Sequence, residues 1–164
     1  MNTDRFEKSV LLPAPRERVW RAVSLAEHFG SWFGADFDGP FVAGTRVTGS
    51  IEPTSVDPDI ARKQQPFAGK PFDLHVVEVR PLEKFSFRWH PYAVDEGADY
   101  GAEPMTLVEF VLASAEGGTL LRVSESGFDQ LPPARRKAAF AAEEGGWTAQ
   151  CGLLRKYLAL HPAL

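Results

Sequence analysis

The chain has 164 residues, of which 44% are hydrophobic and 24% are charged, and its formal net charge is −4. This length predicts one domain over residues 1–164, and the acidic balance argues against a nucleic-acid partner. Cys151 is the only cysteine, which excludes an internal disulfide. No apolar run approaches the ~18 residues of a membrane span or forms a signal peptide, so we expect a cytoplasmic location.

The N-terminal part predicts one strand followed by two short helices. Residues Phe6–Leu12 form the expected strand, and prolines end it. A short helix then begins at Pro15, with Val19 and Val23 on its apolar side, and a second covers Ala26–Trp32. Two helices directly after one strand exclude a plain β-meander.

The next segment predicts a hairpin and a long loop. Residues 34–40 are typical of a turn, and Phe41–Ile51 is expected to form a hairpin that turns at Gly44. Residues Glu52–Lys70 contain three prolines and predict a loop with at most a turn of helix near Asp59–Lys63. Loops of this length in small domains are often functional, so this one is a candidate gate for a binding site.

Strands resume at Pro71, and the apolar register changes parity at Val76 and Val77, which predicts a β-bulge there. The clearest half-buried strand follows, because its aromatic residues alternate strictly with polar ones. These aromatic residues are Phe85, Phe87 and Trp89.

A second long loop, Pro91–Pro104, is a further candidate gate, and Met105–Ala113 and Thr119–Ser126 predict a hairpin. The chain then ends in one long amphipathic helix over Pro133–His161. Its apolar stripe repeats with i, i+4 and i+7 spacing and contains Phe140, Glu144, Trp147, Cys151, Leu154 and Leu158.

The pair Gly145-Gly146 is unusual inside this helix, since glycine costs ~1 kcal/mol there relative to alanine. It predicts a kink or break, or room for a ligand or a closely packed strand. Taken together, the elements predict an α+β helix-grip fold, a curved antiparallel β-sheet wrapped around a long C-terminal helix, with two short helices after the first strand.

Several short motifs, in this order along the chain, resemble the activator of heat-shock-protein-90 ATPase homologue family, which belongs to the START-like, SRPBCC, birch-pollen-allergen-like superfamily. The motifs cover nearly the whole chain. They are Pro15-x-x-x-Val19-Trp20-x-Ala22, Trp32-Phe33, Phe85-Ser86-Phe87-Arg88-Trp89, Thr106-x-Val108-x-Phe110, Gly118-Thr119-x-Leu121, Glu125-Ser126-Gly127-Phe128 and Gly145-Gly146-Trp147.

The resemblance implies a cavity between sheet and helix that binds a small hydrophobic molecule. The residues expected to line it are Trp32, Phe87, Trp89, Phe110, Glu125, Trp147, Cys151 and Leu154. Two alternatives stay open: a cyclase- or lyase-like enzyme that uses a cavity carboxylate, and a stress-response module that acts on a chaperone, although this chain leaves no room for the separate chaperone-gripping domain of the eukaryotic activators.

The remaining polar residues give weaker signals. If Glu125 and Glu144 point inward, they would hold a ligand or act as acid and base; because both lie near element ends, we expect them to reach water instead. Cys151 is expected to act as a small buried hydrophobe rather than a nucleophile. Histidines His75 and His90 are expected at the surface or rim, and no metal, nucleotide or cofactor motif is present. We therefore expect a binding protein rather than an enzyme, with no cofactor.

Overall fold

A computed structural model describes residues 2–93 and 99–164. Seven antiparallel strands form one sheet in the order β1-β7-β6-β5-β4-β3-β2. Four α-helices flank the sheet, and the first of three short 3-10 helices in the described residues directly follows the third α-helix. The strands are β1 (Arg5–Leu12), β2 (Ala35–Phe37), β3 (Arg46–Ile51), β4 (Pro71–Arg80), β5 (Lys84–Trp89), β6 (Thr106–Ala115) and β7 (Gly118–Ser126). The helices are α1 (Arg16–Ser24), α2 (Ala26–Phe33), α3 (Pro58–Gln64), the 3-10 helix Gln65–Phe67 and α4 (Pro133–Leu160).

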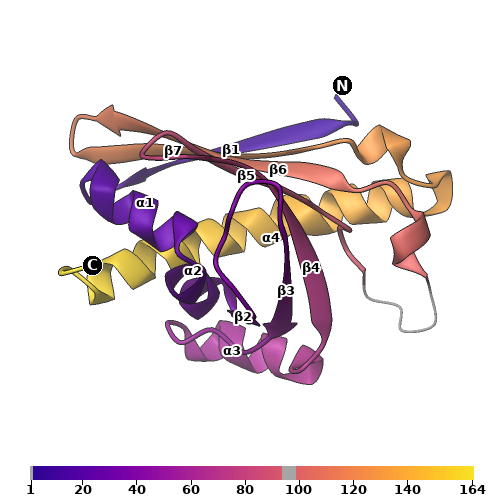
Figure 1. The fold of residues 1–164 in the computed structure, drawn as a ribbon, viewed down its shortest axis with the longest axis horizontal. Coiled ribbons are helices and arrows are strands. Elements are labelled where there is room, and N and C mark those ends of the chain that lie inside the picture. The colour runs from indigo at the N-terminus through magenta and orange to yellow at the C-terminus, as the bar shows by residue number, and fades with distance from the viewer. Residues whose placement is uncertain (1, 94–98) are drawn as a thin grey trace.

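The long helix α4 lies along the inner face of the sheet, beneath β1, β7 and β6 (Figure 1). Helices α1 and α2 pack beside it and close one end of the layer, while α3 lies near β2, β3 and β4. The arrangement confirms the predicted helix-grip fold. None of the helices within the described residues combines the length and the apolar character that a membrane crossing requires.

Alternation along the strands directs one row of side chains inward from each strand. Phe85 and Phe87 on β5, Phe110 on β6, and Phe29 on α2 are at most 1% exposed. The ring of Phe29 meets the rings of the other three at centroid distances of 5.9 to 6.5 Å. The space between sheet and helices is therefore filled with aromatic rings at its centre.

The predicted β-bulge is confirmed, because the pairing of β4 with β5 shifts between Val76 and Glu78. The predicted hairpin over Phe41–Ile51 is wrong in its first half. Strand β3 pairs instead with β2, which lies in the segment expected to be a turn. Phe41 is buried because its ring stacks on Phe85 at 4.9 Å from a loop, so its apolar character reflects packing and not a strand.

The loop over Glu52–Lys70 contains more helix than expected. Helix α3 covers the predicted turn and begins at Asp57, whose side chain accepts hydrogen bonds from the backbone N–H groups of Asp59 and Ile60. Aspartate before a proline in the first turn is a standard helix start. Of the second predicted loop, Pro91–Pro104, residues 94–98 lie outside the described part of the chain.

Helix α4 continues through Gly145 and Gly146 as one helix, so the predicted break is absent. Both glycines are exposed, and a Cβ atom added to either would meet nothing within 4 Å. The glycines therefore do not make room for a packed strand.

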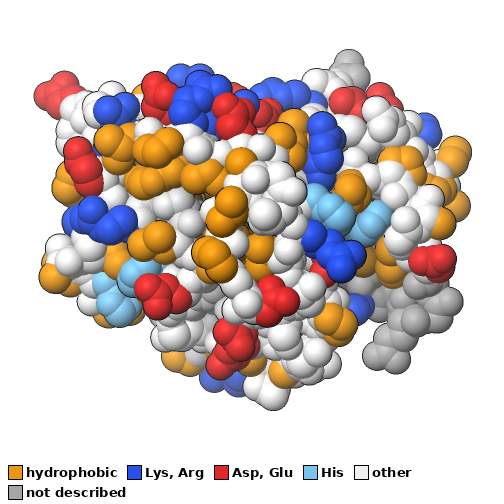
Figure 2. All heavy atoms as spheres, in the orientation of Figure 1, with side chains coloured by type: hydrophobic (Ala, Val, Ile, Leu, Met, Phe, Trp, Pro, Cys, Tyr) orange, Lys and Arg blue, Asp and Glu red, His pale blue; other side chains and the backbone are white. Residues whose placement is uncertain are grey.

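Charged side chains of both signs alternate along the upper edge of the molecule in Figure 2, where β1 and β7 lie in Figure 1. Ion pairs such as Arg5 with Glu7, at 3.1 Å, contribute to this mixture. The surface over β1 and β7 is therefore mixed in charge and not uniformly basic.

Candidate active or binding site

The centre of the candidate site is Glu125 on β7, whose side chain is completely buried. Its Oε2 atom accepts hydrogen bonds from Trp89 Nε1 at 2.9 Å and from Thr106 Oγ1 at 2.6 Å. Its Oε1 atom accepts a hydrogen bond from Trp147 Nε1 at 2.8 Å. The donors come from β5, β6 and α4, so this carboxylate links the sheet to the helix. The expectation that Glu125 reaches water is wrong.

The sequence pattern places Glu125 here for a local reason. Leu121, Val123 and Glu125 alternate on the inward face of β7, and all three are 0% exposed. Glu125 pairs in register with Val108 of β6 and with Phe6 of β1, so it lies within the sheet and not at its edge. A carboxylate in this position is tolerated only because donors saturate it.

A second carboxyl group, Glu143 on α4, lies beside the first. Glu143 is four residues before Trp147, and side chains four apart share one helix face. Burial raises the pKa of Glu143 well above its ordinary value. The negative charge of Glu125 and the hydrogen bond between the two side chains act in the same direction. The Tyr92 backbone acts in the opposite direction by hydrogen bonding to Glu143. Glu143 therefore holds its proton more tightly than an ordinary glutamate does.

Glu144 behaves differently from its neighbour. Its side chain is exposed and forms an ion pair with Lys8 at 3.8 Å. The expectation that Glu144 reaches water is confirmed. The stripe counted from Phe140 selected Glu144, whereas the stripe counted back from Trp147 would have selected Glu143.

A cleft of about 270 Å³ has Glu143 in its lining, whereas Glu125 lies buried behind it. Its other polar lining residues are Lys70 and His90. The apolar and aromatic lining comprises Phe33, Ile51, Phe67, Pro71, Phe72, Trp89, Tyr92 and Ala93. A wider hollow of about 740 Å³ adjoins it and shares most of this lining. The cleft is therefore an aromatic recess with one carboxyl group in its wall.

Three aromatic rings in the lining contact one another. Trp89 lies 6.0 Å from Phe33 and 6.4 Å from Phe72, and Phe33 lies 6.3 Å from Phe72. Trp147 lies behind them, 5.8 Å from Trp89. Because the indoles of Trp89 and Trp147 both donate to Glu125, their ring orientation is fixed from behind.

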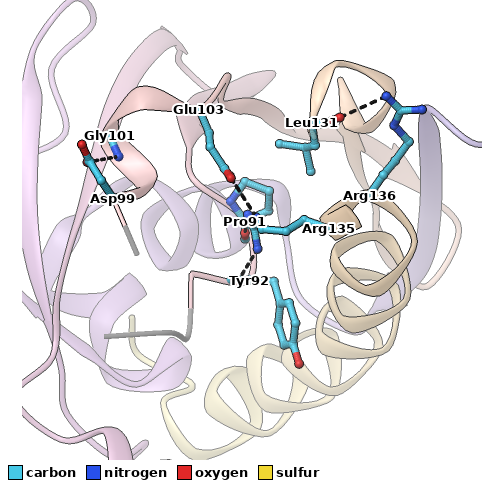
Figure 3. A network of polar contacts seen from close by, with 8 residues as sticks. All are labelled: Pro91, Tyr92, Asp99, Gly101, Glu103, Leu131, Arg135 and Arg136. Atoms are coloured by element: carbon cyan, nitrogen blue, oxygen red, sulfur yellow. Dashed lines mark hydrogen bonds and ion pairs between the residues drawn. The ribbon is translucent and has the colours of Figure 1, made fainter. Parts of the chain in front are cut away.

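Arg135 of α4 holds the chain at the mouth of this cleft. Its guanidinium group donates to the carbonyl oxygens of Pro91 and Tyr92, each at 2.9 Å, and to Glu103 at 2.9 Å (Figure 3). The backbone of Tyr92 has a φ of 49°, in the left-handed region that is uncommon for residues other than glycine. Arg135 thus stabilises a turn that places the Tyr92 backbone against Glu143.

The histidine of the cleft carries no charge near neutral pH. Burial lowers the pKa of His90, an effect that exceeds the opposite influence of Glu103. Within the described part of the chain, its buried Nδ1 atom has no hydrogen-bond partner. His90 is partly buried and lines the same cleft as its neighbour Trp89, although strand parity alone would place the two on opposite faces.

The residues expected to bind a ligand fall into three groups. Trp89 lines the cleft, and Glu125 and Trp147 lie behind it in one hydrogen-bonded cluster. Cys151 is buried one turn beyond Trp147, and burial raises the pKa of its thiol to about 11, so it is protonated at neutral pH. The other four are core residues at most 1% exposed and do not line the cleft; they are Trp32, Phe87, Phe110 and Leu154.

The sequence did not identify Glu143, Lys70 or Tyr92. The helical spacing to Trp147 is the one signal that points to Glu143. No group of three or more histidine, cysteine or acidic side chains is arranged to hold a metal ion among the described residues.

The model of the family described as activator of Hsp90 ATPase homolog 1-like protein matches residues 13–159. The chain belongs to this family. No functionally curated protein matches it.

Solved structures similar to this chain include protein MLL2253 of Mesorhizobium loti, at a TM-score of 0.68 and 22% identity over 94% of this chain and 96% of that one. Protein NE0264 of Nitrosomonas europaea has a TM-score of 0.69 and 16% identity over 100% and 99% of the two chains. DynU16, a protein of the dynemicin biosynthetic locus, has a TM-score of 0.67 and 25% identity over 95% of this chain and 47% of its own. The chain therefore spans about half of DynU16.

Proposed function

We propose that the protein binds a small, largely apolar molecule with an aromatic ring in the cleft beside Trp89, and that Glu143 hydrogen bonds to it. The observation that carries this proposal is the combination of an aromatic recess with a partly buried carboxyl group in its wall. Binding sites for small molecules are typically apolar with a few polar groups that fix orientation. The volume of about 270 Å³ suits a one- or two-ring compound.

The similarity to DynU16 is compatible with this proposal, since that protein belongs to a biosynthetic locus. The Trp89 indole, held by Glu125, supplies a flat surface against which a ring can stack. This differs from the deeper cavity expected from the sequence, whose centre is occupied by phenylalanine side chains.

The test is a titration of the ¹⁵N-labelled protein with the neutral bicyclic probe 1-naphthylmethanol, observed at the indole N–H signals. We expect saturable shifts at Trp89 and Trp147 and smaller ones at Trp20, which is on α1. The variant Phe67→Ala should weaken binding several-fold, because Phe67 lines the cleft and is 46% exposed.

The matched control is Leu11→Ala, since Leu11 is also 46% exposed but lies on β1 outside the cleft. It should bind the probe as the unchanged protein does. Equal weakening by both variants, or the absence of saturable shifts at Trp89 for neutral and charged probes alike, would refute the proposed site.

A second function, acid–base catalysis in the same cleft, is favoured by the raised pKa of Glu143. A carboxyl group with a raised pKa is suited to proton transfer to and from a substrate. A cyclase- or lyase-like reaction would then lose its rate in Glu143→Gln while the probe still binds. The chaperone function has only the family description in its favour, and addition of the protein to Hsp90 at saturating concentration, with ATP hydrolysis as the readout, tests it.

A further inference from the structure

The hydrogen bonds of Glu125 determine what Glu143 can offer a ligand. A carboxylate accepts about four hydrogen bonds. Trp89, Thr106 and Trp147 supply three of them to Glu125. Glu143 hydrogen bonds to Glu125 as well, and because this bond favours the protonated form of Glu143, we infer that Glu143 donates it. A proton in that bond faces Glu125 and not the cleft.

The outward side of Glu143 is consequently an acceptor. Its carboxyl group already takes a hydrogen bond from the Tyr92 backbone, and the same side chain forms part of the cleft wall. A ligand that meets Glu143 therefore needs a hydrogen-bond donor. Aromatic rings beside an acceptor also attract cations, because the face of each ring carries negative charge.

We propose that the cleft selects an organic cation, a protonated amine attached to an aromatic ring, whose ammonium group contacts Glu143 in the cleft wall. Binding exchanges this ammonium group for the proton of Glu143. The inference rests on the proposed function and specifies its ligand class. The exchange is balanced: one ammonium group enters, one proton leaves Glu143 for the solvent, and the net charge of the site is unchanged.

The electrostatics of the site favour this exchange. Two adjacent carboxylates cannot both ionise in a buried position without a counter-charge. A proton supplies it in the empty cleft, and an ammonium group in contact with Glu143 supplies it in the complex. The Trp89 indole, which donates to the Glu125 carboxylate, is polarised so that its face becomes more negative, and this strengthens its attraction for a cation.

The other ionisable groups around the pair do not take this place. The Lys70 ammonium group donates to the carbonyl oxygen of Ala93 at 2.6 Å, and Arg135 is paired with Glu103. His90 at the rim is neutral, and Glu144 on the next position of α4 faces solvent with Lys8. Among the residues that the structure describes, therefore, no cationic side chain forms an ion pair with Glu125 or Glu143.

The test is calorimetric titration with three matched probes, 1-naphthylmethylamine, 1-naphthylmethanol and 1-naphthoate, between about pH 5 and pH 9. Each titration is run in two buffers of different ionisation enthalpy, which reports the protons released. We expect the amine to bind at least ten times more tightly than the alcohol at the alkaline end. At the acid end its binding should release close to one proton, and the alcohol should release none.

Glu143→Gln should abolish proton release and remove the preference for the amine over the alcohol, because the amide cannot take a negative charge. The matched control, Glu144→Gln, should keep both properties, because Glu144 is exposed on the outer side of α4. If the alcohol binds but the amine binds no more tightly and releases no proton, or if naphthoate binds most tightly, the cation inference is wrong and the proposed function stands. If none of the three probes binds, both are wrong.

Discussion

The substitution Glu125→Gln tests whether the buried carboxylate organises the junction between sheet and helix. It preserves the shape of the side chain and replaces one acceptor oxygen by an NH₂ donor. In either orientation this donor faces another donor. It meets Trp147 Nε1 on one side, or Trp89 Nε1 together with Thr106 Oγ1 on the other.

The substitution costs at least one hydrogen bond in either orientation, and the cost is larger when the new NH₂ group faces Trp147. The Thr106 hydroxyl can rotate and Trp89 is partly exposed, but Trp147 is only 2% exposed and its indole N–H has no access to water. Leaving a buried donor without an acceptor costs about 1–3 kcal/mol. For a domain of about this length, each kcal/mol corresponds to roughly 2–4 °C in the melting temperature. We therefore expect Glu125→Gln to melt about 2–12 °C lower.

The assay is thermal and urea unfolding at neutral pH, followed by near-ultraviolet circular dichroism and tryptophan fluorescence. Glu144→Gln is the control, and it should change the free energy of unfolding by no more than about 0.5 kcal/mol, as exposed substitutions usually do. A Glu125→Gln protein as stable as the control would show that removing the buried charge compensates for the lost acceptor, and would refute this reasoning.

Three further predictions concern stability and reactivity. Gly145→Ala should raise the free energy of unfolding by up to about 1 kcal/mol in urea denaturation, because the added methyl group meets nothing and helix propensity improves. Gly30→Ala should lower the free energy of unfolding by about 1–3 kcal/mol, because its Cβ would lie 2.2 Å from the Ala35 carbonyl oxygen. Equal effects of the two substitutions would contradict the packing around α2. Because burial raises the pKa of the Cys151 thiol to about 11, native protein should react slowly with a thiol reagent at neutral pH and unfolded protein rapidly; fast native reaction would contradict its burial. Since the pKa of Glu143 is raised on folding, the folded state binds more protons than the unfolded state. The free energy of unfolding should therefore fall as pH rises from the ordinary pKa of 4.5 through the raised pKa. Urea unfolding at each pH measures this fall, and Glu143→Gln should lack it.

The sequence predicted the elements whose signals are local and repeated. Alternation identified β5, β6 and β7, and proline with aspartate indicated where short helices start. It misplaced the first strand of the hairpin because Phe41 is buried through a ring stacked on Phe85, a contact that alternation cannot reveal. A single apolar residue in a loop and one in a strand look alike until the partner is known.

The candidate site was only partly predictable for a related reason. Strand parity placed Glu125 inward, yet the three donors that make its burial possible come from separate elements and no spacing in the sequence brings them together. Glu143 and Glu144 differ by about 100° around the helix, so a stripe counted from one end or the other selects a different residue. Only the contact of Trp147 with Glu125 decides which one faces the sheet.

The position of the carboxyl pair is hard to explain by stability alone. Replacing a buried ionic network by apolar side chains of similar volume is often neutral or stabilising. The centre of this domain already follows that solution, since Phe29, Phe85 and Phe87 fill it without any polar group. Glu125 and Glu143 lie instead where the aromatic packing opens into a cleft, and there an unfavourable buried charge becomes useful once a ligand supplies its counter-charge. A Glu143→Gln protein that is more stable at alkaline pH but has lost its preference for the amine would show this exchange of stability for binding directly.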